Sequence, residues 1–162
     1  MAKIPLNENE LQAAKNLVSR LQKTQLLKYE DIADKRDQFV ESRRERVFTN
    51  GQSWGEASDA LEIYSMDQDD FFAHLKSVQD DLILQISRFE SQLNQWFDIG
   101  ESHAPYFPWR IIIILSKRGA GDLEMEFLAA YCRHFYDRAR RGSRRDEMIV
   151  ERAIKKGAWD YW

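Results

Sequence analysis

The sequence predicts an all-α protein, a single-domain bundle of about six to seven helices with one long central helix. Apolar residues recur at helical spacing, and the 162 residues include only seven Gly and three Pro, few for the turns of an all-β fold. Hydrophobic residues make up 43% of the chain, enough for the core of a domain of this length. We therefore expect one helical domain over residues 1–162, ending in an aromatic tail at 157–162.

The first helix is expected to begin after Asn7, whose side chain can cap it while Glu10 reaches back to the backbone of Asn7. Its apolar face is expected to hold Leu11, Ala14, Leu17, Val18 and Leu21. A second helix is predicted over residues 29–48, ended by Asn50-Gly51, because both residues tolerate the left-handed conformation. Its apolar side would comprise Ile32, Ala33, Phe39, Val40 and Val47.

A short helix is predicted over residues 54–65, with Ser53 and Glu56 as a capping box and with Ala57, Leu61 and Tyr64 buried. The clearest pattern follows over residues 70–97, where one continuous helix about 42 Å long is expected. Gly100 would end it. Its apolar residues follow a heptad spacing broken only at Gln79: Phe72, Leu75, Leu82, Ile86, Phe89, Leu93 and Trp96.

Residues 109–117 are open to two interpretations. Their four consecutive Ile favour a strand, but the chain offers no second strand of comparable quality. We therefore predict a buried helix with Pro108 in its first turn. A further helix is predicted over residues 122–141, capped by Asp122, and a last one from Ser143 to residue 156. The apolar set of the 122–141 helix is Leu123, Phe127, Leu128, Tyr131 and Phe135.

Several features indicate a soluble, cytoplasmic protein that has no membrane contact. The single Cys132 excludes an internal disulfide and a Cys-rich zinc site. The first ten residues lack the apolar stretch of a signal peptide. The longest apolar run, residues 111–115, is too short to span a bilayer.

The sequence also favours a protein that is not an enzyme and has no metal or cofactor. His74, His103 and His134 do not follow a metal-ligand spacing. Cys132 and His134 lie about 200° apart around a helix, so they cannot form a dyad. The Gly119-Ala120-Gly121 turn lacks the Lys and Ser/Thr of a phosphate-binding loop, and the aspartates at 67–70 lack the Gly and distal Glu of a calcium loop.

Charge is distributed unevenly. Residues 1–100 hold 12 Lys/Arg and 18 Asp/Glu, whereas residues 101–162 hold 12 and nine. The segment 59–98 alone has nine acidic and two basic residues. An acidic helical face can attract a basic protein partner, although the same charge can serve solubility alone. The candidate partner-binding residues are Asp59, Glu62, Asp67, Asp69, Asp70, Asp80 and Asp81.

A basic cluster gives an alternative site. Six arginines fall within thirteen residues and could contact phosphates of nucleic acid: Arg133, Arg138, Arg140, Arg141, Arg144 and Arg145. Asp137, Asp146 and Glu147 partly neutralise them, so local ion pairs at a helix junction are the favoured interpretation. Nucleic acid is accordingly the less favoured partner.

Part of the chain resembles bacterial immunity proteins that neutralise polymorphic nuclease toxins. The resemblance covers about residues 30–116. It rests on Arg36-Asp37-Gln38-Phe39, on Ala60-Leu61-Glu62-Ile63-Tyr64-Ser65, on the acidic turn Met66-Asp67-Gln68-Asp69 with the following Phe72 and Leu75, and on Ile113-Ile114-Leu115-Ser116. It implies a helical fold and inhibition of a toxin by direct binding, without catalysis.

We therefore expect a non-catalytic cytoplasmic immunity protein that binds a basic cognate toxin through its acidic face. A nucleic-acid-associated helical protein using the Arg133–Arg145 cluster is the alternative, and an enzyme of another type is a third, less favoured hypothesis. The sequence leaves the oligomeric state open.

Overall fold

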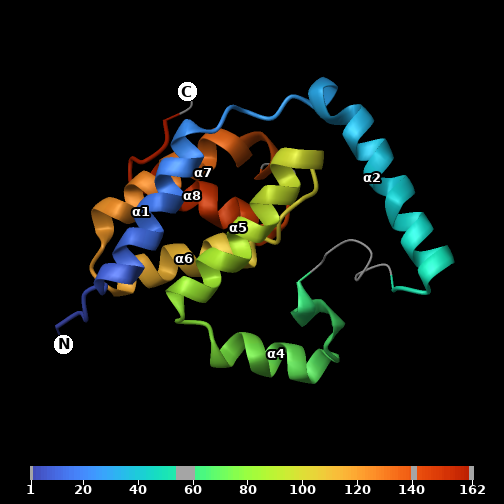
Figure 1. The fold of residues 1–162 in the computed structure, drawn as a ribbon. Helices are drawn as coiled ribbons and strands as arrows, with labels where there is room; N and C mark the ends of the chain where they lie inside the picture. Colours follow the sequence, from blue (N-terminus) through green and yellow to red (C-terminus); the bar gives the residue numbers. More distant parts are fainter. Residues whose placement is uncertain (1, 54–60, 140–141, 161–162) are drawn as a thin grey trace. The chain divides into compact units, whose positions relative to one another are not determined.

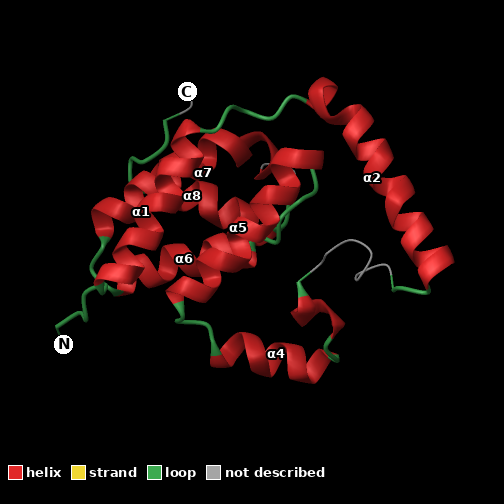
Figure 2. Cartoon of the chain, viewed as in Figure 1, coloured by secondary structure: helices red, strands yellow, loops and turns green. Residues whose placement is uncertain are grey.

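The fold is all-α, as the sequence predicts. The computed structural model describes residues 2–53, 61–139 and 142–160, apart from the side chains of Tyr29, Arg138 and Ala139. Within these ranges it holds seven α-helices and one 3₁₀-helix, and no strand (Figures 1 and 2). The Ile-rich segment is helical, which confirms the choice of helix over strand for residues 109–117.

Backbone contacts divide the chain into two compact units. The first comprises Met1–Leu26, Asp80–Ser91 and His103–Trp162, and the second comprises Leu27–Gln79 and Gln92–Ser102. Helix α5 (Leu82–Ile99) belongs to the first unit up to Ser91 and to the second unit beyond it. The extent of a single domain over residues 1–162 stays a prediction.

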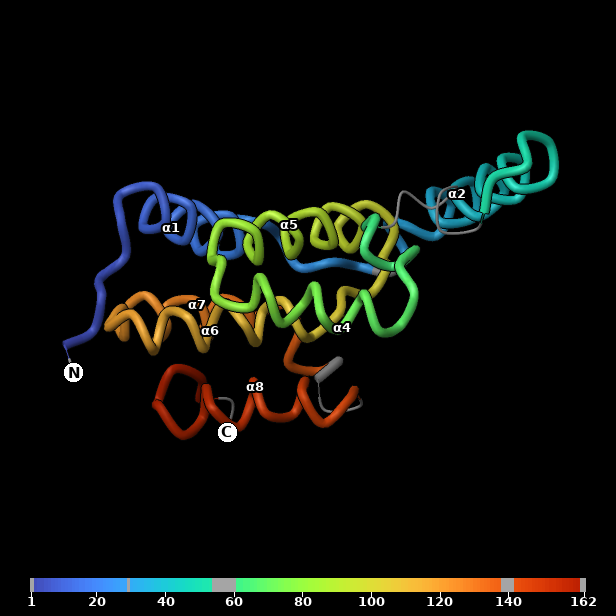
Figure 3. The backbone as a smooth tube through the Cα atoms, turned by 90° about the horizontal axis from the view of Figure 1, so that it is seen from below, coloured from blue at the N-terminus to red at the C-terminus, as the bar shows by residue number. Residues whose placement is uncertain are grey.

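Four complete helices form most of the first unit: α1 (Glu8–Lys23), α6 (Tyr106–Lys117), α7 (Gly121–Ala139) and α8 (Arg144–Lys155). Helix α7 packs against α1, α6 and α8, and α6 also contacts α8. Figure 3 shows α6 and α7 lying between α1 and α8. The central helix of this unit is therefore α7.

An aromatic cluster forms the core of the first unit. Phe89, Phe127, Tyr131 and Phe135 are each at most 1% exposed, and His103 is buried among them. The His103 Nε2 and the Tyr131 hydroxyl lie 2.7 Å apart, so these two buried polar groups satisfy each other. The His103 ring also meets Phe135 at 4.5 Å and Phe89 at 5.3 Å between centroids.

Capping residues set the helix starts where the sequence predicts them. The Asn7 Oδ1 accepts the Glu10 N–H at 2.8 Å, and the Glu10 carboxylate accepts the Asn7 N–H at 3.0 Å. Ser143 forms the same reciprocal arrangement with Asp146 at the start of α8. Helix α7 differs, because it begins at Gly121 and places Asp122 in its first turn rather than at its cap. On α1 the predicted face is buried except Leu11, which is 36% exposed.

The second unit contains α2 (Tyr29–Asn50), the 3₁₀-helix η1 (Glu62–Ser65), α4 (Gln68–Ser77) and the end of α5. Gly51 ends α2 with a φ of 67°, which confirms the predicted stop. Of the predicted apolar side of α2, Ile32 is buried, whereas Ala33 is exposed. Gly100, with a φ of 70°, lies against Ile32, since a Cβ there would approach the Ile32 Cδ1 to 2.8 Å.

The predicted single helix over residues 70–97 is wrong. The chain forms α4 and α5, separated by a turn at residues 78–81. The Ser77 hydroxyl donates to the His74 carbonyl at 2.7 Å near the end of α4, and the Asp81 carboxylate accepts the Leu84 N–H at 3.0 Å near the start of α5. These side-chain–backbone hydrogen bonds compete with a continuous helix, and the chain turns at the position where Gln79 interrupts the heptad pattern.

The break also changes which residues are buried. Phe72, a predicted core residue, is 57% exposed, and no residue of α4 is buried. The buried part of the predicted stripe lies on α5, at Leu82, Ile86, Phe89, Leu93 and Trp96.

The predicted helix over residues 54–65 falls mostly outside the described residues, as does its capping partner Glu56. Its last four residues form the 3₁₀-helix η1 rather than α-helix. Tyr64, expected to be buried, is 47% exposed.

Candidate partner-binding surface

The predicted acidic residues lie in different parts of the fold. Glu62 is on η1, Asp67 directly precedes α4, and Asp69 and Asp70 are in the first turn of α4. All four are exposed and belong to the second unit. Asp80 and Asp81 belong to the first unit, and Asp59 lies outside the described residues. The structure therefore gathers four of the seven predicted residues on one short segment.

Asp67 also has a structural role in this segment. Its Oδ1 accepts the backbone N–H of Asp70 at 3.0 Å, which makes it the N-cap of α4. This hydrogen bond keeps the pKa of the Asp67 carboxyl below its usual value. The carboxylate is therefore ionised at neutral pH and lies at the positive end of the helix dipole.

Large apolar side chains are exposed on the same segment. Phe72 is 57%, Tyr64 47% and Met66 40% exposed. We call these three residues, together with Glu62, Asp67, Asp69 and Asp70, the η1–α4 surface. The sequence analysis placed Tyr64 and Phe72 in the core. For Phe72, the sequence contains one sign of this exposure. Gln79 interrupts the apolar heptad pattern between residues 68–77 and α5, so the two segments need not form one buried stripe.

Aromatic contacts order this surface. Phe71 is half-buried, with its ring 6.1 Å from that of Tyr64 and 5.6 Å, edge-on, from that of Phe72. Gln92 on α5 donates from Nε2 to the Tyr64 hydroxyl at 3.0 Å. The exposed rings of Tyr64 and Phe72 are thus held by neighbours within the second unit.

Asp80 and Asp81 form intramolecular contacts. Asp80 pairs with Arg110 at 2.8 Å and with Lys117 at 3.5 Å. Asp81 accepts the Leu84 N–H near the start of α5. These contacts give both residues a role in the fold of the first unit.

Arg133, from the alternative basic set, holds the end of α1. Its Nη2 donates to the carbonyls of Leu21 at 2.6 Å, Gln22 at 3.0 Å and Thr24 at 2.5 Å. A guanidinium in this position satisfies carbonyl groups that the helix end leaves open. The adjacent His134 bonds to the Leu21 carbonyl at 2.6 Å through Nε2.

Arg144 and Arg145, the other two basic residues whose side chains the structure describes, have different neighbours. Arg144 pairs with Glu147 at 3.1 Å and with Glu151 at 2.8 Å. Arg145 lies over the Tyr106 ring at 5.3 Å. Arg140, Arg141 and the side chain of Arg138 lie outside the described residues. Arg144 thus forms local ion pairs of the expected kind, whereas Arg133 binds backbone carbonyls at the end of α1.

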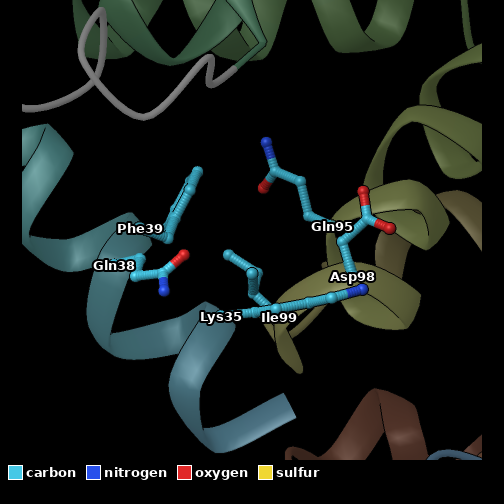
Figure 4. A pocket seen from close by; sticks show the side chains of 6 residues that line it. All are labelled: Lys35, Gln38, Phe39, Gln95, Asp98 and Ile99. Atoms are coloured by element: carbon cyan, nitrogen blue, oxygen red, sulfur yellow. The ribbon is translucent and has the colours of Figure 1, made fainter.

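A pocket of about 410 Å³ lies between α2 and the end of α5 in the second unit (Figure 4). Phe39 and Ile99 give it apolar walls, and its polar lining comprises Lys35, Gln38, Gln95 and Asp98. The volume suits a small ligand or a side chain. The lining presents neither a Cys or Ser nucleophile nor a pair of carboxylates for acid–base chemistry.

The single cysteine of the chain, Cys132, is buried. Burial raises the pKa of the Cys132 thiol to about 12, so it stays protonated at neutral pH and is a poor nucleophile. Within residues 2–53, 61–139 and 142–160, no cluster of three or more His, Cys, Asp or Glu side chains is placed to hold a metal ion. Across the same ranges no helix is long and apolar enough to cross a membrane.

Comparison of the chain with protein-family models, with curated proteins and with solved structures finds no match.

Proposed function

We propose that this chain is a non-catalytic cytoplasmic binding protein that inhibits a basic bacterial toxin enzyme, of the nuclease type, by direct contact through the η1–α4 surface. The observation that carries the proposal is that α4 buries none of its own residues while exposing Phe72 beside Asp69 and Asp70. The side chains of α4 are at most half-buried, so this helix gains less than a core helix from tertiary packing, which normally supplies most helical stability. A partner that covers α4 would supply it.

The composition of the surface fits a protein partner. Exposed aromatic residues surrounded by polar groups are typical of the anchors that supply most of the binding energy of interfaces. Three anchors, Tyr64, Met66 and Phe72, lie within nine residues of the chain. The neighbouring acidic side chains add long-range attraction for a basic partner and so raise the association rate.

A nuclease is the favoured class of partner because its substrate is a polyanion. The cleft that binds nucleic acid carries Lys and Arg side chains that neutralise phosphates. An acidic surface with projecting aromatic rings complements such a cleft in charge. The resemblance to immunity proteins rests partly on the same residues, Tyr64-Ser65 and the acidic turn that follows them.

The test begins with capture of the partner by the tagged full-length chain in the native host at low salt. The captured protein is then purified, and its nuclease activity is measured with and without the chain. We expect stoichiometric inhibition that weakens at high salt. Capture of an acidic protein, or of an enzyme that the chain leaves fully active, contradicts the proposal.

A matched pair of variants ties the inhibition to the proposed surface. Phe72→Ala removes the most exposed anchor of the η1–α4 surface and should weaken binding at least tenfold, because interface anchors of this kind contribute about 2 kcal/mol or more. Phe48→Ala removes a Phe that is 84% exposed on α2 and should leave affinity unchanged. Equal losses in both variants contradict the assignment of the surface.

A further inference from the structure

Helix α2 contacts the end of α5 at two points in the second unit. At the first, Ile32 packs on Gly100, where an added Cβ would approach the Ile32 Cδ1 to 2.8 Å. At the second, the Arg43 guanidinium lies 3.6 Å from the Glu101 carboxylate. The pocket of Figure 4 is lined from α2 by three residues that fall between these points in the sequence, Lys35, Gln38 and Phe39. It is therefore a space that the packing of α2 on the end of α5 leaves open.

Neighbouring contacts fix both sides of this pocket. Helix α5 ends in a Schellman motif, closed by the N–H groups of Gly100 and Glu101 at 2.8 and 3.4 Å from their acceptor carbonyls. On α2, the guanidinium of the buried Arg43 lies over the Phe39 ring, 3.8 Å from its centre. Backbone hydrogen bonds on one side and a buried guanidinium on the other thus set the walls in the absence of any ligand.

The pocket carries one positive and one negative side chain. Lys35 comes from α2 and Asp98 from the last turn of α5, and both are exposed (Figure 4). Among the residues that the structure describes, neither the Lys35 ammonium nor the Asp98 carboxylate has a hydrogen-bond or ion-pair partner. Asp98 also lies at the C-terminal end of α5, where the helix dipole is negative. Both charges are therefore available to a ligand, and the Asp98 side attracts an ammonium group.

We propose that this pocket binds a small zwitterionic ligand of the amino-acid class that has an apolar side chain. The ligand carboxylate pairs with Lys35 and its ammonium group with Asp98, while its side chain packs against Phe39 and Ile99. The Gln38 amide can both donate and accept hydrogen bonds. The volume of about 410 Å³ lies in the lower part of the range of small-ligand sites, about 300–1,000 Å³. The pocket shares no residue with the η1–α4 surface, so this site is independent of the proposed inhibition of a toxin.

Calorimetric titration of the full-length protein tests the site. The probes are L-phenylalanine and the dipeptide glycyl-L-phenylalanine, which share an ammonium group, a carboxylate and an apolar ring but differ in the spacing of the two charges. We expect saturable binding with one site per chain. The tighter-binding probe shows whether the spacing of a free amino acid or that of a dipeptide fits the distance between Lys35 and Asp98.

Two derivatives of the tighter-binding probe test the charge pairing without any change in the protein. Acetylation of the amino group removes the positive charge of the probe, and amidation of the carboxylate removes the negative charge. We expect each derivative to bind about tenfold more weakly, as loss of one charge-assisted hydrogen bond does. This series does not depend on the folding of a variant.

Matched variants then assign each charge of the ligand to one side chain. Lys35→Gln should weaken binding of the zwitterionic probe about tenfold but leave binding of the amide unchanged, because the amide has no carboxylate to pair with Lys35. Asp98→Asn should weaken binding of the zwitterionic probe and leave binding of the acetylated derivative unchanged. Arg36→Gln removes the same charge as Lys35→Gln from the next exposed position of α2, outside the pocket lining, and should leave all affinities unchanged.

Three results would overturn the proposal. One is the absence of saturable binding of both zwitterionic probes. Another is an affinity that neither acetylation nor amidation changes, which indicates apolar contact alone. The third is an equal loss of affinity in Lys35→Gln and Arg36→Gln, which indicates general charge attraction. Each variant is first compared with the parent protein by thermal unfolding, so that a loss of binding is measured on folded protein.

Discussion

Arg118 binds the carboxylate of Glu10 through two hydrogen bonds of 2.9 Å, one from Nη1 to Oε2 and one from Nη2 to Oε1. The same guanidinium donates to the carbonyls of Ile4 and Pro5 at 2.7 Å. One side chain after α6 therefore fixes both the segment that precedes α1 and the first turn of α1. The hydrogen bonds from Arg118 are the main reason that the pKa of Glu10 lies below its usual value of 4.5.

This pair predicts a specific loss of stability in acid. Because the pKa of Glu10 is lower in the folded than in the unfolded state, the pair stabilises the fold above about pH 4.5, and this contribution disappears as pH falls through the folded pKa. Arg118→Gln should lower the free energy of unfolding at pH 7 by about 1.5–3 kcal/mol. It should also reduce the dependence of stability on pH below 4.5.

Urea unfolding at pH 7, 4.5 and 3 measures both effects. Arg144→Gln is the control, because it breaks only the exposed ion pairs with Glu147 and Glu151 and should change stability little. An unchanged pH dependence in Arg118→Gln would show that Glu10 does not carry the acid sensitivity.

Phe89→Ala should be among the most destabilising single changes in the first unit. The Phe89 side chain is fully buried and meets the rings of His103, Phe127 and Tyr131 at 5.3–6.1 Å. Removing a buried Phe ring costs about 3–5 kcal/mol, because the cavity closes only in part. Ile83→Ala, at a position on α5 that is 43% exposed, is the control and should cost far less. A loss below about 1 kcal/mol in Phe89→Ala would contradict this core assignment.

His134 predicts a second pH effect in a different window. Burial lowers its pKa, the hydrogen bond to Leu21 opposes this, and the charge of Arg133 lowers the pKa further. The unfolded chain therefore takes up a proton first, and stability should fall as pH drops below about 6.5 until the folded pKa is reached. His134→Gln should remove this loss, whereas His74→Gln should retain it. Melting temperatures between pH 8 and pH 5 measure the difference, and an identical pH dependence in His134→Gln and the parent protein excludes the assignment.

The sequence predicts local structure well where a few adjacent residues determine it. Asn7 with Glu10 and Ser143 with Asp146 set helix starts through contacts three residues apart, and such contacts are visible in the sequence. The 109–117 helix also follows from a simple argument, because a lone strand has no partner.

The failures come from features that depend on tertiary contacts. The heptad spacing of residues 72–96 is equally compatible with one helix and with two. The hydrogen bonds of Ser77 near the end of α4 and of Asp81 near the start of α5 favour two helices. The exposure of Phe72 follows from that break, and Tyr64 lies on the 3₁₀-helix η1 rather than on the predicted α-helix, so the aromatic part of the η1–α4 surface could not be seen in the spacing. In the sequence, Arg133 belongs to a basic cluster, but in the structure it donates to backbone carbonyls at the end of α1, 109–112 residues away.

The acidic half of the η1–α4 surface predicts how affinity for the captured partner responds to charge. Asp69→Lys combined with Asp70→Lys reverses two exposed charges, while Asp67 is kept because it caps α4. Charges at the edge of an interface act mainly on the association rate, and salt screens them. We therefore expect slower association at low salt and a difference that shrinks as salt rises. Asp34→Lys combined with Asp37→Lys, on exposed positions of α2, is the matched control and should have a smaller effect.

Reversal of the basic cluster separates the two sequence-based hypotheses. Arg140, Arg141 and Arg144 changed together to Glu should leave affinity for the partner nearly intact if the acidic surface carries the binding. A nucleic-acid-binding protein would behave in the opposite way, losing its affinity for nucleic acid with the Arg changes and keeping it with the Asp changes. Surface plasmon resonance at several salt concentrations, on variants with native-like melting, measures association and dissociation separately. If the Asp69 and Asp70 reversal leaves partner binding intact while the Arg reversal destroys it, the acidic surface is not the binding site.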